Sequence, residues 1–168
     1  MMRRIHITGN AGSGKTTLAR KLGEITELEV HGLDAVVWQA GWKATPLEQR
    51  RELERELIAP ESWIIEGVSR IVREAADTVV FLDVSPWRAT WRCAKRNLPY
   101  LFRSRPGLPE DCPEIKIVWP LLRIIWKFNG LVRPTILKDF EAQSGKQFFH
   151  IRNEADLERF MAQLQNPK

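Results

Sequence analysis

The sequence predicts a single α/β domain in which a parallel β-sheet lies between two layers of helices. Segments of strand length alternate with segments of helical period along the 168 residues, and such alternation builds three-layer folds through right-handed crossovers. The segments Trp63–Gly67 and Asp77–Asp83 are largely apolar, as strands covered on both faces are. A glycine-rich loop joins the first expected strand, Arg4–Thr8, to the first expected helix. These features indicate an open sheet with a ligand site at the carboxyl ends of its strands.

Length and composition fit one domain, residues 1–168, which can bury a core without disulfides or a structural metal. Cys93 and Cys112 lack the spacing of a zinc site or a disulfide framework, so a reducing, cytoplasmic compartment fits best. The basic start is followed by too short an apolar stretch for a signal peptide, and the apolar stretch 115–132 is interrupted by charged residues and proline. We expect a cytoplasmic monomer or homodimer with no membrane partner.

The glycine-rich loop, residues 9–16, matches the phosphate-binding pattern G-x-x-x-x-G-K-[ST] throughout. Its glycines let several backbone N–H groups point at one anion, and the helix that follows adds the positive end of its dipole. Lys15 can reach the outer phosphates of a nucleoside triphosphate, and the Thr16 hydroxyl is placed to hold Mg²⁺. The residues expected to bind the nucleotide are Gly9, Asn10, Ala11, Gly12, Ser13, Gly14, Lys15, Thr16 and Thr17.

The second expected strand, Leu28–Asp34, ends in an acid. Because ligands of open α/β sheets sit beyond the carboxyl ends of the strands, Asp34 is a candidate for chemistry in the same crevice as the loop. Alternatively, Asp34 only begins the next turn or helix. Trp38 and Trp42 follow, and they either wall an acceptor pocket by stacking on a base or ring, or pack in the core.

The next two strands end in carboxylates that compete for one role. Glu66 suits a position beside the waters of nucleotide-bound Mg²⁺, whereas the apolar residues before Asp83 fit the pattern of a magnesium-side acid better. Arg70 suits a planar anion of the acceptor, a phosphate or a carboxylate, which a guanidinium holds with two hydrogen bonds. The alternative for Arg70 is a surface ion pair with Glu66 or Glu74.

Positive charge is concentrated in residues 85–138, which hold eleven Lys and Arg against three Asp and Glu. The helix expected after Ser85 carries four basic residues at helical spacing, Arg88, Arg92, Lys95 and Arg96. Residues 99–113 contain Arg103, Arg105 and four prolines, and such a segment beside a phosphate site is typical of a lid.

Local signals predict the remaining elements. A capping box at Thr45–Glu48 starts a helix to about Ala59, on which Glu52, Glu54, Arg55 and Glu56 form a solvated charged face. Helices are expected from 115 and over 133–143, followed by a strand over 147–151 and a last helix over 154–165 capped by Asn153. The three histidines, His6, His31 and His150, are expected to be structural.

The segment Glu66-Gly67-Val68-Ser69-Arg70 resembles the D-G-x-x-R element of adenylate-kinase-like P-loop kinases, with Glu in place of Asp. The chain is also similar, over nearly its whole length, to a bacterial branch of adenylate-kinase-related kinases labelled DNA topology modulation protein. That similarity lies in Leu33-Asp34, Gly41-Trp42, the helix of Arg88, Arg92 and Arg96, Arg103-Ser104-Arg105-Pro106 and Cys112-Pro113-Glu114. The resemblance implies a sheet in the order 2-3-1-4-5, a mobile Arg-rich lid and phosphoryl transfer from ATP.

Two features depart from the nucleoside monophosphate kinases. Their lid is longer, and an acid at the position of Asp34 is unusual among them. Asp34 instead resembles the acceptor-binding aspartate of shikimate and gluconate kinases, which orients a hydroxyl. The Glu at position 66 also leaves its distance to the magnesium waters open.

We therefore expect an ATP-dependent kinase that uses Mg²⁺. Lys15 and the loop hold the phosphates, Thr16 and Glu66 the metal, and Asp34 and Arg70 a small acceptor, a nucleotide or a hydroxylated metabolite. Trp38 and Trp42 are the other expected acceptor contacts. The arginines expected to close over the transferring phosphoryl group are Arg88, Arg92, Arg103 and Arg105.

The alternative is an ATP-binding or ATP-hydrolysing regulatory protein that acts on DNA without a small acceptor. Its support in the sequence is the basic segment 85–138, which no recognised nucleic-acid motif accompanies. A GTPase switch is disfavoured because the chain lacks an N-K-x-D guanine-reading motif.

Overall fold

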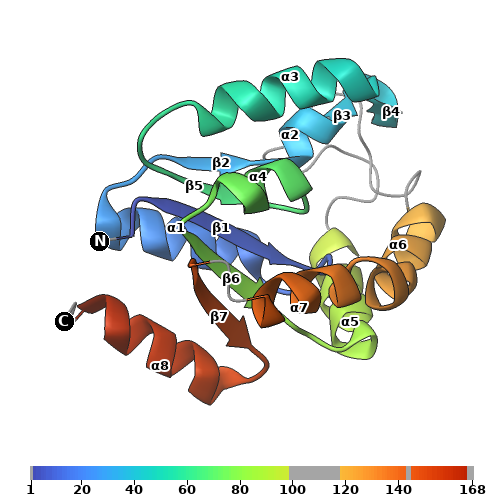
Figure 1. Ribbon diagram of the computed structural model, residues 1–168. Helices are drawn as coiled ribbons and strands as arrows, with labels where there is room; N and C mark the ends of the chain where they lie inside the picture. Colours follow the sequence, from blue (N-terminus) through green and yellow to red (C-terminus); the bar gives the residue numbers. More distant parts are fainter. Residues whose placement is uncertain (1, 99–117, 143–144, 166–168) are drawn as a thin grey trace.

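The computed structural model describes residues 2–98, 118–142 and 145–165, and shows a parallel sheet of five strands between two layers of helices (Figure 1). Across the sheet the strands are β2 (Val30–Gly32), β5 (Trp63–Glu66), β1 (Arg4–Gly9), β6 (Thr78–Leu82) and β7 (Gln147–Ile151). Counted along the chain, this is the order 2-3-1-4-5, and every neighbouring pair is parallel. The expected three-layer α/β fold and the sheet order are confirmed.

Helices connect successive strands and extend the chain beyond them. They are α1 (Lys15–Thr26), α2 (Asp34–Val37), α3 (Leu47–Ile58), α4 (Arg70–Ala75), α5 (Pro86–Asn97), α6 (Val118–Leu131), α7 (Arg133–Glu141) and α8 (Glu154–Gln165). A small hairpin of β3 (Trp38–Gln39) and β4 (Lys43–Ala44) around the 3-10 turn η1 (Ala40–Trp42) connects α2 to α3. Every helix within the described ranges falls short of the length and apolar character needed to cross a bilayer.

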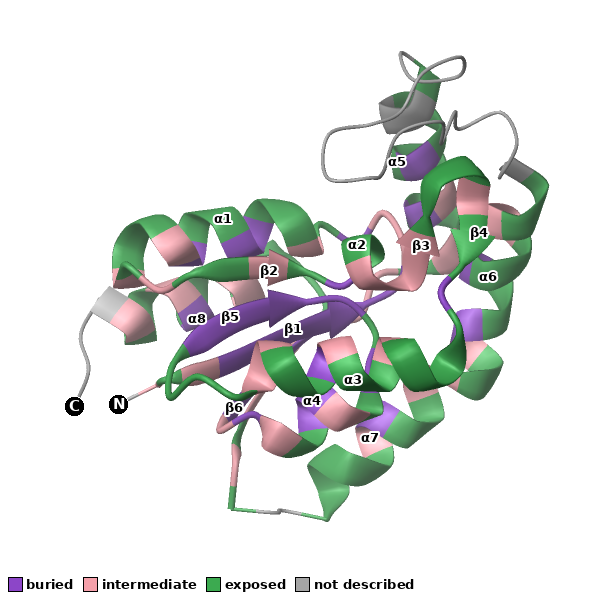
Figure 2. Ribbon diagram, turned by 90° about the horizontal axis from the view of Figure 1, so that it is seen from above, coloured by how far each residue is buried: buried purple, intermediate pink, exposed green. Residues whose placement is uncertain are grey.

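One face of the sheet is covered by α1 and α8. Ile5 and Ile7 of β1 point to this face and pack with Leu18 and Leu22 of α1 and with Phe160 of α8. Alternate residues of a strand point to opposite faces, so this register sends His6 and Thr8 to the other side of the sheet. Figure 2 shows β1 and β5 as buried ribbons between the two helical layers.

The other face is covered by α3 and α4 and, further along the sheet, by α6 and α7. Trp63 of β5 packs with Val72 of α4, and Phe81 of β6 packs with Phe128 of α6 and Ile136 of α7. All five side chains are buried. Of the candidate site residues, Arg70 lies on a helix of this layer, α4.

Two of the three predicted caps are confirmed. Ser85 Oγ accepts a hydrogen bond from the Arg88 N–H at 3.4 Å, and Asn153 Oδ1 accepts one from the Asp156 N–H at 2.9 Å. The capping box at Thr45 is wrong: α3 begins at Leu47, Pro46 is its N-cap residue, and no side chain caps it. The Thr45 N–H instead donates to the Val37 carbonyl at 3.0 Å, which closes the β3–β4 hairpin.

The expectation of a solvated face on α3 is also wrong at one position. Glu54 is buried, and its carboxylate accepts hydrogen bonds from the Arg50 guanidinium at 2.8 Å and from the Ser69 hydroxyl at 2.8 Å. Ser69 in turn caps α4, because its Oγ also accepts from the Val72 N–H at 3.3 Å. A buried carboxylate needs such partners, and these tie α3 to α4.

Candidate active site

The phosphate loop lies at the carboxyl end of the central strand β1 and leads into α1. Gly12 of the loop packs against α5, where an added Cβ would come within 2.6 Å of the Ala89 carbonyl oxygen and 2.8 Å of Cys93 Sγ. Its φ of +72° is also one that residues with a side chain rarely adopt. Glycine is therefore required here both by the turn and by the approach of α5.

Helix α6 holds the loop from another side through Asn10. This buried side chain donates from Nδ2 to the Ile125 carbonyl oxygen at 2.8 Å, and its Oδ1 accepts from the Ala11 N–H at 2.8 Å. Lys15, the first residue of α1, reaches back along the loop, and its Nζ donates to the Asn10 carbonyl oxygen at 2.9 Å. The conformation of the loop thus depends on α6 as well as on its own glycines.

Thr16 and Glu66 form a polar pair beside the loop. The register of β1 and β5 places Glu66 opposite Ile7, two residues before Gly9, and Thr16 Oγ1 donates to Glu66 Oε1 at 2.8 Å. Glu66 is buried at the end of its strand. A hydroxyl and a carboxylate at this position are hard oxygen ligands, which fit Mg²⁺ when nucleotide phosphates and water supply the remaining ligands.

Asp34 lies at the same edge of the sheet. Strand β2 pairs with β5 so that Gly32 is opposite Glu66, and the Leu33 N–H donates to the Glu66 carbonyl oxygen at 2.9 Å. Gly67 has a φ of +139°, and a Cβ there would lie 2.6 Å from Leu33 Cβ. This close contact fixes Leu33. Asp34 follows it as an exposed residue and is the first residue of α2, so the alternative expectation that Asp34 begins the next turn or helix agrees with the structure.

Trp38 and Trp42 pack on each other across the β3–β4 hairpin. Their ring centroids are 5.4 Å apart at an interplanar angle of 82°, and both side chains are half-buried. Gly41 and Trp42 both have positive φ, 73° and 60°, and for the tryptophan this conformation costs about 1–3 kcal/mol. The strained turn directs the Trp42 ring onto Trp38 and leaves an aromatic pair that is partly open to solvent.

A groove of about 660 Å³ lies between α3, α4 and α7 with the turn that precedes α7. Val68 and Ser69, which follow Gly67 directly, form part of its wall. Its charged lining has five cations and two acids: Arg50, Arg51, Arg70, Arg73 and Lys138, with Glu54 and Asp139. The excess of positive charge suits an anionic ligand.

Arg70 lies on the rim of this groove. Its side chain is 82% exposed, and Nε donates to Glu74 Oε1 at 2.6 Å one turn along α4. This hydrogen bond and the charge of Glu74 raise the pKa of Arg70 above its already high value. The surface ion pair expected as the alternative is therefore present, and the structure brings Arg70 to the groove but not to the phosphate loop.

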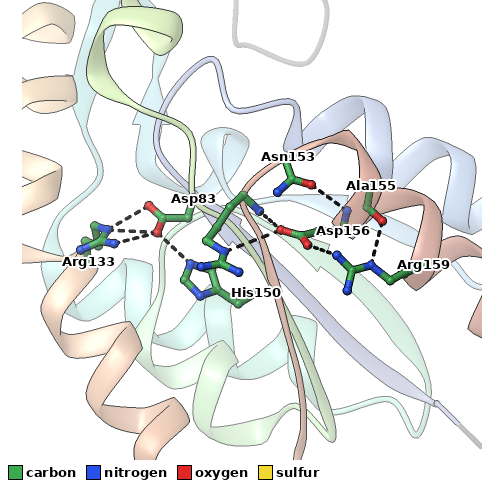
Figure 3. Close-up of polar contacts among 8 residues, drawn as sticks. Asp83, Arg133, His150, Asn153, Ala155, Asp156 and Arg159 are labelled. Atoms are coloured by element: carbon green, nitrogen blue, oxygen red, sulfur yellow. Dashed lines mark hydrogen bonds and ion pairs between the residues drawn. The ribbon is translucent and has the colours of Figure 1, made fainter.

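Asp83 is engaged by two side chains from elsewhere in the chain (Figure 3). Its carboxylate accepts hydrogen bonds from Arg133 Nε at 2.9 Å and Nη2 at 2.9 Å, and its Oδ2 lies 2.7 Å from His150 Nε2. The His150 ring also stacks on Phe81, with centroids 5.3 Å apart. Burial alone would raise the pKa of Asp83, but the hydrogen bonds from Arg133 and His150 outweigh it and lower that pKa.

The arginines expected over the phosphates fall into two groups. Arg88 and Arg92 are exposed on α5, next in sequence to Ala89 and Cys93, whose side of the helix contacts the loop at Gly12. Arg103, Arg105 and the lid expected over 99–113 lie outside the described residues.

Sequence reasoning missed the Asp83 cluster and the buried Glu54 network. Each joins residues far apart in the chain: Asp83 is 50 residues from Arg133, and Glu54 is 15 from Ser69. The usable signals were Ser69, a good N-cap residue before a short apolar segment, and the acid at the end of β6. Neither signal identifies the partner, because the partner is set by the packing of helices on the sheet.

The comparisons with known proteins concern the fold. A shikimate kinase from Acinetobacter baumannii, solved with shikimate, has a TM-score of 0.58 at 18% identity, over 100% of this chain and 97% of that one. A sugar kinase from Janibacter sp. HTCC2649 has a TM-score of 0.56 at 20% identity, over 99% of this chain and 96% of that one. A shikimate kinase from Bacteroides thetaiotaomicron has a TM-score of 0.52 at 19% identity, over 98% of this chain and 97% of that one.

No protein-family model and no curated protein sequence matches the chain. These two shikimate kinases and the sugar kinase share the fold of this chain over 98% or more of its length and 96% or more of theirs. At these identities, the likeness shows the fold alone. Similarity to the DNA topology modulation branch remains a resemblance of sequence.

Proposed function

We propose that this chain is a kinase that transfers the γ-phosphoryl group of ATP to a small acceptor carrying both a hydroxyl and an anionic group. The observation that carries this proposal is the meeting of three features at one edge of the sheet. These are the phosphate loop, the Thr16–Glu66 pair and Asp34, which two strand pairings bring to the ends of β1, β5 and β2.

The donor half is the loop with Lys15, Thr16 and Glu66. The loop N–H groups and the Lys15 ammonium would bind the β- and γ-phosphates, because the ammonium already reaches the loop backbone at 2.9 Å. Thr16 and Glu66 would hold Mg²⁺, which neutralises charge on the β- and γ-phosphate oxygens when bound. Asp83 is excluded from this role in our proposal, because Arg133 and His150 occupy its carboxylate.

The acceptor half is Asp34 with the groove beyond Gly67. Asp34 would orient the acceptor hydroxyl and accept its proton. It lies two residues after Gly32, which is opposite Glu66 in the pairing of β2 with β5. Arg70 and the neighbouring cations of the groove would bind the anionic group, a carboxylate or a phosphate. The Trp38–Trp42 pair offers ring faces for a base or a sugar ring.

Phosphoryl transfer passes through a loose transition state, so the protein chiefly positions groups and neutralises charge. Arg88 and Arg92 project from the helix that packs on Gly12, and we assign them, with Arg103 and Arg105, to the transferring group. One arginine in such a position accounts for about 10³ to 10⁵ in rate.

The test is a screen of phosphoryl transfer from labelled ATP to nucleoside monophosphates, sugars and hydroxylated carboxylic acids, with ATP alone as the hydrolysis background. K15A should lose ATP turnover and ATP binding. D34N should lose acceptor-dependent turnover and keep ATP affinity, and E24Q on the exposed face of α1 is its matched control. Equal loss of ATP binding in K15A and D34N would contradict the division into donor and acceptor halves.

A further inference from the structure

The end of the molecule formed by α5 and α6 exposes an unusual number of large apolar side chains. Seven of the twelve exposed large apolar residues in the described chain lie there. They are Trp87, Trp91, Leu98, Trp119, Ile124, Trp126 and Leu131, and the exposed fractions of Trp87, Trp91 and Trp119 are 73%, 72% and 81%. Scattered single residues of this kind are normal on a protein surface, but a concentration on two adjacent helices marks an interaction site.

A ring contact joins the tryptophans of the two helices. Trp87 of α5 and Trp126 of α6 meet edge to face, with ring centroids 5.0 Å apart at 88°. Trp87 and Trp91 of α5 and Leu98 at its C-cap repeat at spacings of four and seven, so they share a face. Figure 1 shows α5 and α6 side by side at the end of the molecule toward which β1 points.

The same two helices carry positive charge and no negative charge. Lys95 on α5 and Arg123 and Lys127 on α6 are exposed beside the tryptophans, and neither helix contains Asp or Glu. We call the seven apolar residues and these three cations the aromatic-basic surface. Arg88 and Arg92, assigned above to the nucleotide, add to the positive field of this end.

We propose that the aromatic-basic surface binds the surface of a lipid bilayer that contains anionic headgroups. Tryptophan prefers the interface between headgroups and acyl chains, and Lys and Arg beside it attract anionic lipids. Helices that lie in a bilayer surface combine these features in two adjacent stripes, an apolar one and a basic one. This proposal departs from the expectation, drawn from the sequence, of no membrane partner.

Two other occupants fit the surface less well. Single-stranded nucleic acid would use the tryptophan rings and the cations, but base stacking gives no role to the exposed Leu98, Ile124 and Leu131. A second copy of the chain related by twofold symmetry would set the cations of one copy against those of the other, without an acid on either helix to pair with them. A bilayer accounts for the aliphatic side chains and the charge together.

Binding at this surface would act on helices that hold the phosphate loop. The buried side of α5 presents Ala89 and Cys93 to Gly12, and α6 accepts the Asn10 hydrogen bond at the Ile125 carbonyl. The same two helices therefore carry the aromatic-basic surface and hold the phosphate loop.

The test is flotation of the full chain with vesicles of phosphatidylcholine alone and of phosphatidylcholine with about one third phosphatidylglycerol. We expect binding to the anionic vesicles, a blue shift of tryptophan emission on binding, and release by high salt. W91A/W119A should lose binding although its charge is unchanged. K95Q/R123Q/K127Q should weaken binding on the order of a hundredfold, from the usual contribution of each basic residue near an anionic membrane surface.

The matched controls are L47A, which removes an exposed apolar side chain from α3, and R20Q/K21Q/R55Q, which removes three exposed cations elsewhere. Both should float nearly as the parent does. Equal loss of vesicle binding in the surface variants and the control variants would overturn the proposal. So would a parent that binds a single-stranded oligonucleotide but no vesicles, or a parent that binds no vesicles and forms a dimer that W91A/W119A dissociates. Absence of any vesicle binding by the parent would overturn it as well.

Discussion

Substitution of His6 by glutamine should flatten the pH dependence of stability between neutral and mildly acidic pH. His6 is fully buried in β1, and its Nε2 lies 3.1 Å from the Gly67 carbonyl oxygen. A carbonyl only accepts, so Nε2 carries the proton and Nδ1 is the bare nitrogen. Nδ1 is buried and has no hydrogen-bond partner among the described residues. Protonation would therefore place a positive charge in the core without a partner.

The magnitude follows from the pKa of His6, which burial lowers to about 3 from 6.5, with the charges of Arg73, Lys146 and Lys15 acting in the same direction against the hydrogen bond to Gly67. Because the folded pKa is below the unfolded one, the unfolded chain binds more protons between these values, and stability falls as the pH falls through this window. One proton corresponds to about 1.4 kcal/mol per pH unit, so the parent should lose about 2 kcal/mol from this group between pH 7 and pH 5.

The assay is urea unfolding of the parent, H6Q and H31Q at pH 7, 6 and 5. H6Q retains a side-chain N–H for the Gly67 carbonyl, and its loss of stability at pH 7 does not enter the comparison, which concerns slopes. H31Q shows what removing an imidazole from the edge strand β2 does to the same profile. A parent whose stability runs parallel to that of H6Q across this range would refute the assignment of a neutral, buried imidazole.

Three further substitutions test the site. G67A should destabilise the fold by about 2–4 kcal/mol, because the backbone has a φ of +139° and the new Cβ would lie 2.6 Å from Leu33 Cβ; a variant as stable as the parent in urea would show that Leu33 moves aside freely. E66Q should keep ATP binding in the absence of Mg²⁺ and raise the Mg²⁺ concentration needed for turnover, and an unchanged Mg²⁺ dependence would remove Glu66 from the metal role. D83N should lose about 2 kcal/mol of stability at neutral pH, since it weakens the pair with Arg133. The folded state lowers the pKa of Asp83, so the ionised carboxylate stabilises the fold at pH values above its unfolded pKa, and this stabilisation is lost as the pH falls below about 4. The difference in free energy of unfolding between D83N and the parent should therefore narrow below that pH. A difference that persists in acid would contradict this cause.

The parts of the fold that the sequence predicts are those specified within a few residues. The phosphate loop, the Ser85 and Asn153 caps and the apolar strands each depend on local backbone geometry or on burial pattern. Helix α4 was missed because its six residues are too few to show a helical period. The capping box failed because the Thr45 N–H bonds across the hairpin to Val37, and the chain enters α3 one residue later.

The parts that could not be predicted depend on pairs of residues brought together by packing. In the sequence, Glu54 is one of several charged residues on a polar helix. Its buried role depends on Ser69, the N-cap residue of α4, whose hydroxyl lies 2.8 Å from the Glu54 carboxylate. In the sequence, Asp83 at the end of β6 fits the pattern of a metal-side carboxylate. In the structure, α7 and β7 bring Arg133 and His150 to it. In both cases the residue type was informative and the role was set by its partner.

The dipeptide Glu66-Gly67 joins the halves of the site. The Glu66 carboxylate accepts from Thr16 beside the phosphate loop, and its carbonyl accepts from the Leu33 N–H next to Asp34. The Gly67 N–H donates to the Ile7 carbonyl at 3.0 Å, and its own carbonyl lies against His6 in the core. Two residues therefore set the spacing between the Glu66 carboxylate and Asp34, to which our proposal assigns metal binding and acceptor binding respectively. Our proposal then requires that G67A, in whatever fraction folds, lose acceptor-dependent turnover more than ATP binding, because Leu33 rather than the loop would give way.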